Sequence, residues 1–132
     1  MIDTILISPD KELRAVVRAA AEGTLVHFAI ECDSVREGMD TLRKGTIKIV
    51  VVDMFLGESS GLDALKLLKK IDETLVLILI TRLHGRGTLE RAFRYGANDV
   101  LVYPTSVEAI RQTLLHRLEL VAESNTITFQ QT

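Results

Sequence analysis

Polar side chains follow four apolar runs of the chain, each at the point where the run ends. They are Asp10 after the first run, Asp53 at the end of the third, Thr81 after the fourth and Tyr103 after the fifth. Two carboxylates held close together repel each other, so such a pair is stable when a cation lies between them. Carboxylate, carbonyl and water oxygens suit Mg²⁺, and the Thr81 hydroxyl can donate to a phosphoryl oxygen. If these run ends meet in space, the sequence predicts a small acidic pocket that holds a metal and handles phosphate.

The apolar runs have the composition of buried strands. They are short, rich in β-branched residues and bounded by turn-forming residues, which is typical of strands covered on both faces. The predicted strands span residues 3–7, 25–30, 47–53, 75–80 and 99–102. Open α/β sheets bind ligands at the carboxyl ends of their strands, so this arrangement brings the polar residues to the functional edge.

Amphipathic segments alternate with these strands and predict five helices. Ser34 and Thr105 begin capping boxes, and Pro9 suits the first position of the first helix. The third helix, 60–71, is expected to bury Ala64, Leu67, Leu68 and Ile71, and the fourth helix to bury Leu89, Ala92 and Phe93. Strands and helices in alternation predict an α/β fold: a doubly wound, five-stranded parallel sheet of the flavodoxin-like order 2-1-3-4-5, in three αβα layers.

Composition limits the class of protein. The chain has 132 residues, a net charge of -2 and one cysteine, which suits one domain without an internal disulfide. The charge gives no support to a nucleic-acid surface, no apolar run has the length of a membrane span, and the first residues lack the pattern of a signal peptide. We therefore expect a cytoplasmic domain over residues 1–123, followed by a polar tail or the start of a linker over 124–132.

Each polar residue also has a structural explanation. Asp10 suits the first turn of a helix, where the helix dipole favours a carboxylate. Thr81 can cap the turn that follows its strand. Asp53 is harder to explain in this way, because a buried strand seldom ends in an unpaired carboxylate.

Four motifs together resemble the receiver domain of bacterial response regulators, the CheY-like family, over about residues 3–121. The segment VVVDMFLGESSGLDAL resembles the family's third strand, phosphoacceptor loop and third helix, with Asp53 at the phosphoacceptor position. Within it, Gly61-Leu62 resembles the pair that opens the helix. ILIT at 78–81 resembles the fourth strand with its hydroxyl residue, and GANDVLVYP at 96–104 resembles the fifth-strand signature. Each motif alone is weak, whereas four in register are specific.

The resemblance implies a signalling domain of a two-component phosphorelay rather than an enzyme. A histidine kinase or phosphotransfer protein would pass a phosphoryl group to Asp53. Mg²⁺ held by Asp10, Asp53 and the backbone carbonyl of Phe55 would assist the transfer. Thr81 would act as the switch hydroxyl. The face formed by residues 88–120 would then bind or release a downstream effector domain or protein, or pair with a second copy of the chain.

Several positions depart from the family pattern. Pro9 stands where the first of two adjacent acids is usual, with Asp10 at the second. Tyr103 replaces the lysine before the fifth-strand proline, so a neutral phenol stands in place of an ammonium group. Val100 replaces an aromatic switch residue, and Gly57 replaces a loop proline. These changes weaken both the metal pocket and the phosphoryl chemistry that the resemblance implies.

Arg82 stands where the family prefers a small residue. It is either a solvated loop side chain or the substitute for the lost cation, as His84 or Arg86 could also be, because a guanidinium can bind a phosphoryl group with two hydrogen bonds. Two functions stay open: a phosphoacceptor receiver with a weakened Mg²⁺ pocket, and a phosphorylation-independent pseudo-receiver that acts as a protein–protein interaction module. An unrelated enzyme or flavin protein is disfavoured, since the sequence has neither a phosphate-binding glycine loop nor a nucleophile with its base.

Overall fold

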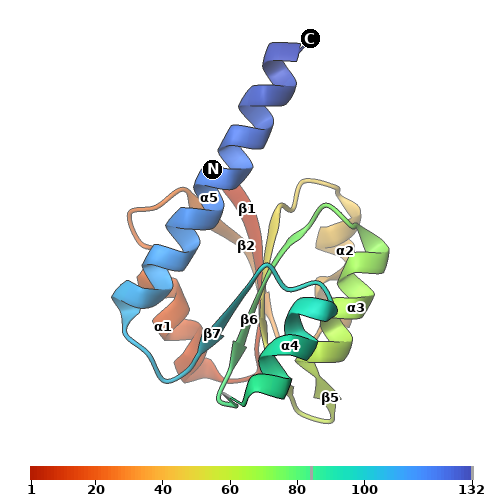
Figure 1. Cartoon of the computed structure of the whole chain (residues 1–132), viewed down its shortest axis with the longest axis vertical. Helices are drawn as coiled ribbons and strands as arrows, with labels where there is room; N and C mark the ends of the chain where they lie inside the picture. Colours follow the sequence, from red (N-terminus) through yellow and green to blue (C-terminus); the bar gives the residue numbers. More distant parts are fainter. Residues whose placement is uncertain (84, 132) are drawn as a thin grey trace.

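A parallel sheet of five strands, in the order β2-β1-β3-β6-β7, forms the centre of the molecule (Figure 1). The computed structural model describes residues 1–83 and 85–131. The main strands are β1 (Ile2–Ile7), β2 (Val26–Cys32), β3 (Ile49–Asp53), β6 (Val76–Thr81) and β7 (Asp99–Val102), and a short antiparallel hairpin of β4 (Phe55–Leu56) and β5 (Ser59–Ser60) follows β3. Counted along the main sheet alone, this is the predicted order 2-1-3-4-5, and the fold prediction is confirmed.

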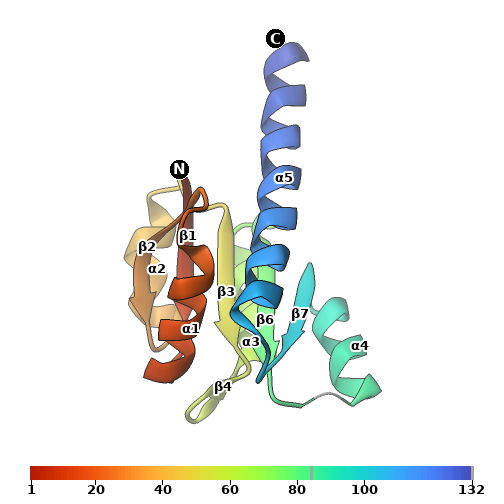
Figure 2. The same cartoon turned by 90° about the vertical axis from the view of Figure 1, so that its left-hand side faces the viewer.

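Helices cover both faces of the sheet. They are α1 (Lys11–Ala21), α2 (Val35–Arg43), α3 (Gly61–Ile71), α4 (Arg86–Arg94) and α5 (Val107–Gln131). α1 and α5 lie on one face, and α2, α3 and α4 lie on the other, as Figure 1 and Figure 2 show together. Right-handed crossovers between parallel strands produce this three-layer arrangement.

The central strand β3 contributes to both layers of the core. Val50 and Val52 pack beneath α2, α3 and α4, whereas Ile49 and Val51 pack beneath α1 and α5. All four side chains are buried. Consecutive residues of a strand point to opposite faces, so an uninterrupted apolar run is what a strand covered on both sides requires. Asp53 is the first polar residue of this strand, and it is therefore held at the edge of a rigid, fully packed element.

α3 buries only part of the predicted face: Ala64 and Leu68 are buried as expected. Leu65 and Leu68 are buried, whereas Leu67 is 46% exposed and Ile71 is also exposed. The helix starts at Gly61, which is itself buried, and its buried positions follow at helical intervals from that glycine. The expectation for Leu67 and Ile71 was wrong because the leucine-rich segment offers two possible apolar stripes, and only the packing of the first turn selects one.

Two further helix predictions need correction. α4 buries Thr88 and Ala92, but Phe93 is 52% exposed. This helix is short and borders the edge strand β7, so only a narrow stripe of it is covered (Figure 2). The first helix begins at Lys11 and not at Pro9, because Asp10 is its N-cap.

α5 continues to Gln131, where the sequence predicted a polar tail from residue 124. Figure 2 shows its last turns beyond the end of the sheet. The domain limit at residue 123 stays a prediction. Over residues 1–83 and 85–131, the chain forms no helix of the length and hydrophobicity needed to cross a membrane.

The corrected buried face of α3 can be tested with a pair of neighbouring leucines. Leu68→Ala removes a fully buried side chain and should lower the free energy of unfolding by about 2–5 kcal/mol. Leu67→Ala, at an exposed position, should change it by less than about 0.5 kcal/mol. Urea denaturation followed by circular dichroism measures both, and equal losses in the two variants would contradict the assignment.

Candidate functional site

Asp53 lies at the carboxyl edge of the sheet, where the ends of β1, β3, β6 and β7 come together (Figure 2). It is only 2% exposed. Its Oδ2 accepts a hydrogen bond from the Ser8 hydroxyl at 2.7 Å, and its Oδ1 accepts one from the N–H of Phe55 at 3.0 Å. Buried carboxylates need such partners. Both oxygens of Asp53 are therefore bound by neutral groups of the protein.

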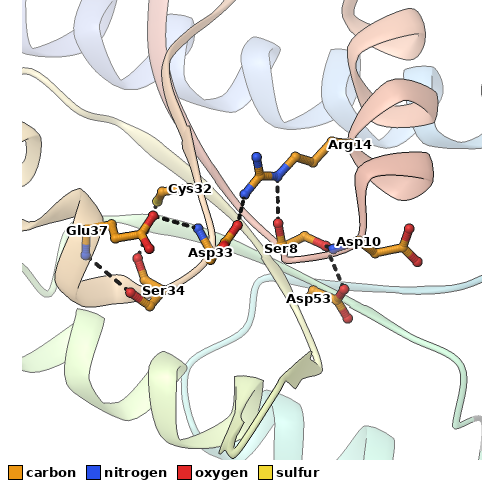
Figure 3. Close-up of polar contacts among 8 residues, drawn as sticks. All are labelled: Ser8, Asp10, Arg14, Cys32, Asp33, Ser34, Glu37 and Asp53. Carbon is orange, nitrogen blue, oxygen red and sulfur yellow. Dashed lines mark hydrogen bonds and ion pairs between the residues drawn. The ribbon is translucent and has the colours of Figure 1, made fainter.

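Ser8 is a site residue that the sequence reasoning missed. It follows β1 directly and is fully buried. Its hydroxyl oxygen accepts a hydrogen bond from the N–H of Asp10 at 3.1 Å, and the same hydroxyl donates to Asp53. The Ser8 carbonyl accepts Nε of Arg14 at 2.6 Å, and the Arg14 guanidinium also pairs with Asp33 after β2 (Figure 3). These contacts fix the hydroxyl so that its proton points to the carboxylate. Its place immediately after an apolar run is the one sequence signal that could have identified it.

Asp10 caps the start of α1. Its Oδ1 accepts the N–H groups of Glu12 and Leu13 at 3.0 and 3.1 Å, as an N-cap does. Its Oδ2 accepts a hydrogen bond from the Arg82 guanidinium at 2.6 Å. The pKa of Asp10 lies below its ordinary value of 3.8. The hydrogen bond from the Leu13 N–H lowers it most, and the hydrogen bond and charge of Arg82 lower it further, whereas burial acts in the opposite direction. Asp10 is thus already paired with a cation of the protein.

Thr81 and Tyr103 complete the edge. The buried Thr81 hydroxyl accepts the N–H of Leu83 at 2.9 Å and donates to the Leu83 carbonyl at 3.3 Å, which is the capping role considered for it above. The N–H of Tyr103 donates to the Thr81 carbonyl at 2.8 Å. The Arg82 guanidinium lies 5.1 Å from the centre of the Tyr103 ring, within the range of a cation–π contact. Arg82 therefore connects the ends of β1, β6 and β7.

The other predicted positions lie apart from this group. Val100 is half-buried against the core beneath α2, α3 and α4. Pro9 is exposed. Arg86 pairs with Glu90 at 3.1 Å. The remaining candidate cation, His84, lies outside the described residues.

Comparison with known proteins identifies the fold family. The family model described as "Response regulator receiver domain" matches residues 5–115. The chain belongs to this family. Among curated relatives, the acid tolerance regulatory protein ActR of Sinorhizobium medicae (strain WSM419) is 31% identical to this receiver over 123 residues. The match covers 87% of the chain and spans 63% of the relative's length.

Solved structures show the same fold. A CheY-like response regulator receiver domain protein from Methanospirillum hungatei JF-1 has a TM-score of 0.79 at 13% identity, covering 94% of this receiver and 98% of that chain. The beryllofluoride-activated NtrC4 receiver domain dimer has a TM-score of 0.78 at 21% identity. That match covers 90% of this receiver and 98% of the NtrC4 chain.

Receivers generally bind Mg²⁺, but the donor set of this receiver does not fit a resident ion. Mg²⁺ is held by one or two carboxylates with oxygen ligands around them. Here Asp10 pairs with Arg82, whose positive charge opposes a second cation, and Asp53 already accepts two hydrogen bonds. In the part of the chain that the structure describes, no three His, Cys, Asp or Glu side chains gather as a metal-binding group. Ligation by the Phe55 carbonyl stays a prediction.

Gly61 allows α3 to begin against the end of β3. Its N–H donates to the Met54 carbonyl at 2.7 Å. A Cβ atom at this position would lie 2.5 Å from the Asp53 carbonyl oxygen and 2.7 Å from the Met54 Cα, closer than real Cβ contacts. Since both neighbours are backbone atoms, a side chain here would displace the loop that holds Asp53.

The pairing of Asp10 with Arg82 predicts a pH-dependent stability difference. Asp10→Asn keeps a good N-cap but loses the charge, so at neutral pH it should lower the free energy of unfolding by at most about 1 kcal/mol for this partly exposed pair. The folded pKa of Asp10 lies below its unfolded value. The difference from the unmodified protein should therefore shrink as the pH falls below 3.8 and vanish below the folded pKa.

Urea titrations of both proteins between neutral and acid pH measure this difference. Arg82→Gln is the matched control, since it removes the same pair from the other side and should converge with the unmodified protein over the same pH range. A gap that stays constant on acidification would contradict the ionic pairing.

Proposed function

We propose that this receiver works as a protein–protein interaction module whose state does not depend on phosphorylation of Asp53. The observation that supports this most directly is that the carboxylates of the site are already satisfied within the protein. Asp53 accepts hydrogen bonds from the Ser8 hydroxyl and a backbone N–H, and Asp10 is paired with Arg82. A site arranged in this way is stable without a metal ion or a phosphoryl group.

The chemistry of the surrounding side chains agrees with the proposal. Catalysis of phosphoryl transfer consists mainly of positioning and of positive charge around the transferring group. The phenol of Tyr103 supplies no positive charge at the fifth-strand position. Arg82 is engaged with Asp10 and the Tyr103 ring. Arg14, another cation described at this edge, is engaged with the Ser8 carbonyl and Asp33. A phosphoryl group on Oδ2 of Asp53 would also have to displace the buried Ser8 hydroxyl.

Membership of the family implies kinases and effectors as partners. In the proposed function, the partner is an effector domain or protein that binds the face of α4, β7 and α5, and a second copy of the chain could bind there too. A histidine kinase or phosphotransfer protein is not required for the signal. We place the domain in the cytoplasm, in keeping with its family.

The position of Arg82 supports a second candidate function, phosphorylation at Asp53 with a substitute cation. The guanidinium contacts Asp10 and the Tyr103 ring, and a guanidinium released from Asp10 can donate two hydrogen bonds to a phosphoryl group. In that case Arg82→Ala should abolish the phosphorylation of Asp53 by a small-molecule donor.

The two candidates predict different responses to phosphoryl donors. With Mg²⁺ and acetyl phosphate, intact-mass measurement should show no phosphoryl adduct on the unmodified protein. With Mg²⁺ and beryllofluoride, the amide NMR signals near Thr81 should not shift. A phosphoryl adduct that disappears in Asp53→Asn would overturn the proposal in favour of the second candidate.

A gain-of-function variant provides the reference for these measurements. Pro9→Asp with Tyr103→Lys restores the pair of adjacent acids with Asp10 and a cation at the end of β7. Because two adjacent carboxylates favour a bound cation, this variant should acquire Mg²⁺-dependent amide shifts and a response to beryllofluoride. Its response shows that the assay detects a competent pocket in this fold.

A further inference from the structure

A hollow of about 220 Å³ lies beside the site, between the β4–β5 hairpin, the first turn of α3 and α4. The hairpin and α4 lie at the same end of the molecule (Figure 1). Phe55 of the hairpin and Leu83 of the β6–α4 loop contribute to its wall, and Met54 and Leu62 contribute apolar surface. Hydrophobic side chains from segments far apart in the sequence therefore surround one concave surface.

Two of these side chains are unusually exposed. Phe55 is 47% exposed and Leu83 is 48% exposed. Single exposed apolar residues are normal in soluble proteins. Two large ones on the wall of the same hollow form an apolar surface that a partner can cover.

The charged side chain in the lining of the hollow is positive. Of the described residues that line it, Arg91 alone is charged. α4 carries three arginines and one acid, Glu90, which pairs with Arg86. Among the contacts of residues 1–83 and 85–131, Arg91 has no ion pair. Glu58 of the hairpin and Asp63 in the first turn of α3 lie on the neighbouring elements, but neither lines the hollow. The guanidinium of Arg91 therefore favours an acidic group on the segment that binds there.

Backbone hydrogen bonds connect the wall of the hollow to the site. The N–H of Phe55 donates to Asp53 at 3.0 Å, and the N–H of Leu83 donates to Thr81 at 2.9 Å. The two exposed apolar side chains are thus held in place by the residues at the ends of β3 and β6. The hollow is preorganised by the same carboxyl edge that carries the receiver's site.

We propose that this hollow is a docking site for an acidic, apolar segment of a partner protein. The segment inserts an aliphatic or aromatic side chain between Phe55 and Leu83 and places a carboxylate on Arg91. Burial of the apolar side chain supplies affinity, and the charge-assisted hydrogen bond to the guanidinium supplies orientation. This surface lies between α4 and the hairpin, whereas the family's predicted partner face includes β7 and α5. The proposal holds whether or not Asp53 accepts a phosphoryl group.

The test uses a random peptide library displayed on phage and selected on the whole chain. A Phe55→Ser, Leu83→Ser double variant serves for counter-selection. Enriched peptides should share a carboxylate next to an aliphatic or aromatic residue. Synthetic copies should bind about tenfold more weakly to Phe55→Ser and to Arg91→Gln, which corresponds to about 1.4 kcal/mol for each contact.

Two exposed positions on α4 provide matched controls. Phe93→Ser and Arg94→Gln remove the same kinds of side chain from positions that do not line the hollow. Both should change the affinity by less than about twofold. Circular dichroism confirms that each variant is folded, and all these changes are at exposed residues.

Three results would overturn the proposal. The first is selection of no peptide that discriminates against the double variant. The second is enrichment of peptides without a carboxylate, or an equal loss of affinity in the controls. The third is self-association of the chain that Phe55→Ser abolishes, as measured by analytical ultracentrifugation, because the occupant would then be a second copy. None of these results depends on whether Asp53 is phosphorylated, so failure here is distinguishable from failure of the proposed function.

Discussion

The carboxyl edge of this receiver depends on the burial of one charge. Asp53 ends a strand that is packed on both faces, and an ionised carboxylate in that position is costly unless donors or a cation surround it. The protein meets the requirement with donors: the Ser8 hydroxyl and the Phe55 N–H. The Ser8 hydroxyl can act in this way because the Asp10 N–H occupies its acceptor side. The geometry of β1, of the start of α1 and of the hairpin after β3 therefore follows from one buried charge.

Most of the fold could be predicted because the apolar runs are unambiguous. The run before Asp53 is too short for a helix and too continuously apolar for an exposed strand. The sequence therefore predicted both that this run is a strand and that the strand is buried. Helix faces were less certain. In α3 the leucines allow two stripes, and Leu67 was assigned to the wrong one; the choice is made by Gly61, whose close approach to β3 is a tertiary contact. Phe93 was misplaced for a related reason, since periodicity does not show how narrow the covered stripe of α4 is.

The residues of the site that lie at strand ends could be predicted from the sequence, but their contacts with distant residues could not. Asp53 and Thr81 come where β3 and β6 end, which the sequence marks clearly. Ser8 was missed because a serine after an apolar run has many ordinary uses, and its contact with Asp53 joins residues 45 positions apart. The pair of Asp10 with Arg82 spans 72 positions and depends on which way a long side chain turns. Contacts of this kind are set by packing and charge in three dimensions, and no local pattern encodes them.

The departures from the family pattern make sense together as a balance of charge. With two adjacent acids, the phosphoacceptor aspartate and one lysine, the family pattern leaves an excess of negative charge that a metal ion can neutralise. Here an acid and the lysine are both missing and Arg82 is added, so the pocket has one negative charge fewer than the family pattern implies. Arg82 then neutralises Asp10, and neutral donors hold Asp53. Both carboxylates thus have partners within the protein without a metal ion or a phosphoryl group, and the loops beside them carry the exposed side chains of Phe55 and Leu83. In the proposed function, the substitutions that weaken the chemistry of the pocket leave this exposed surface to bind a partner.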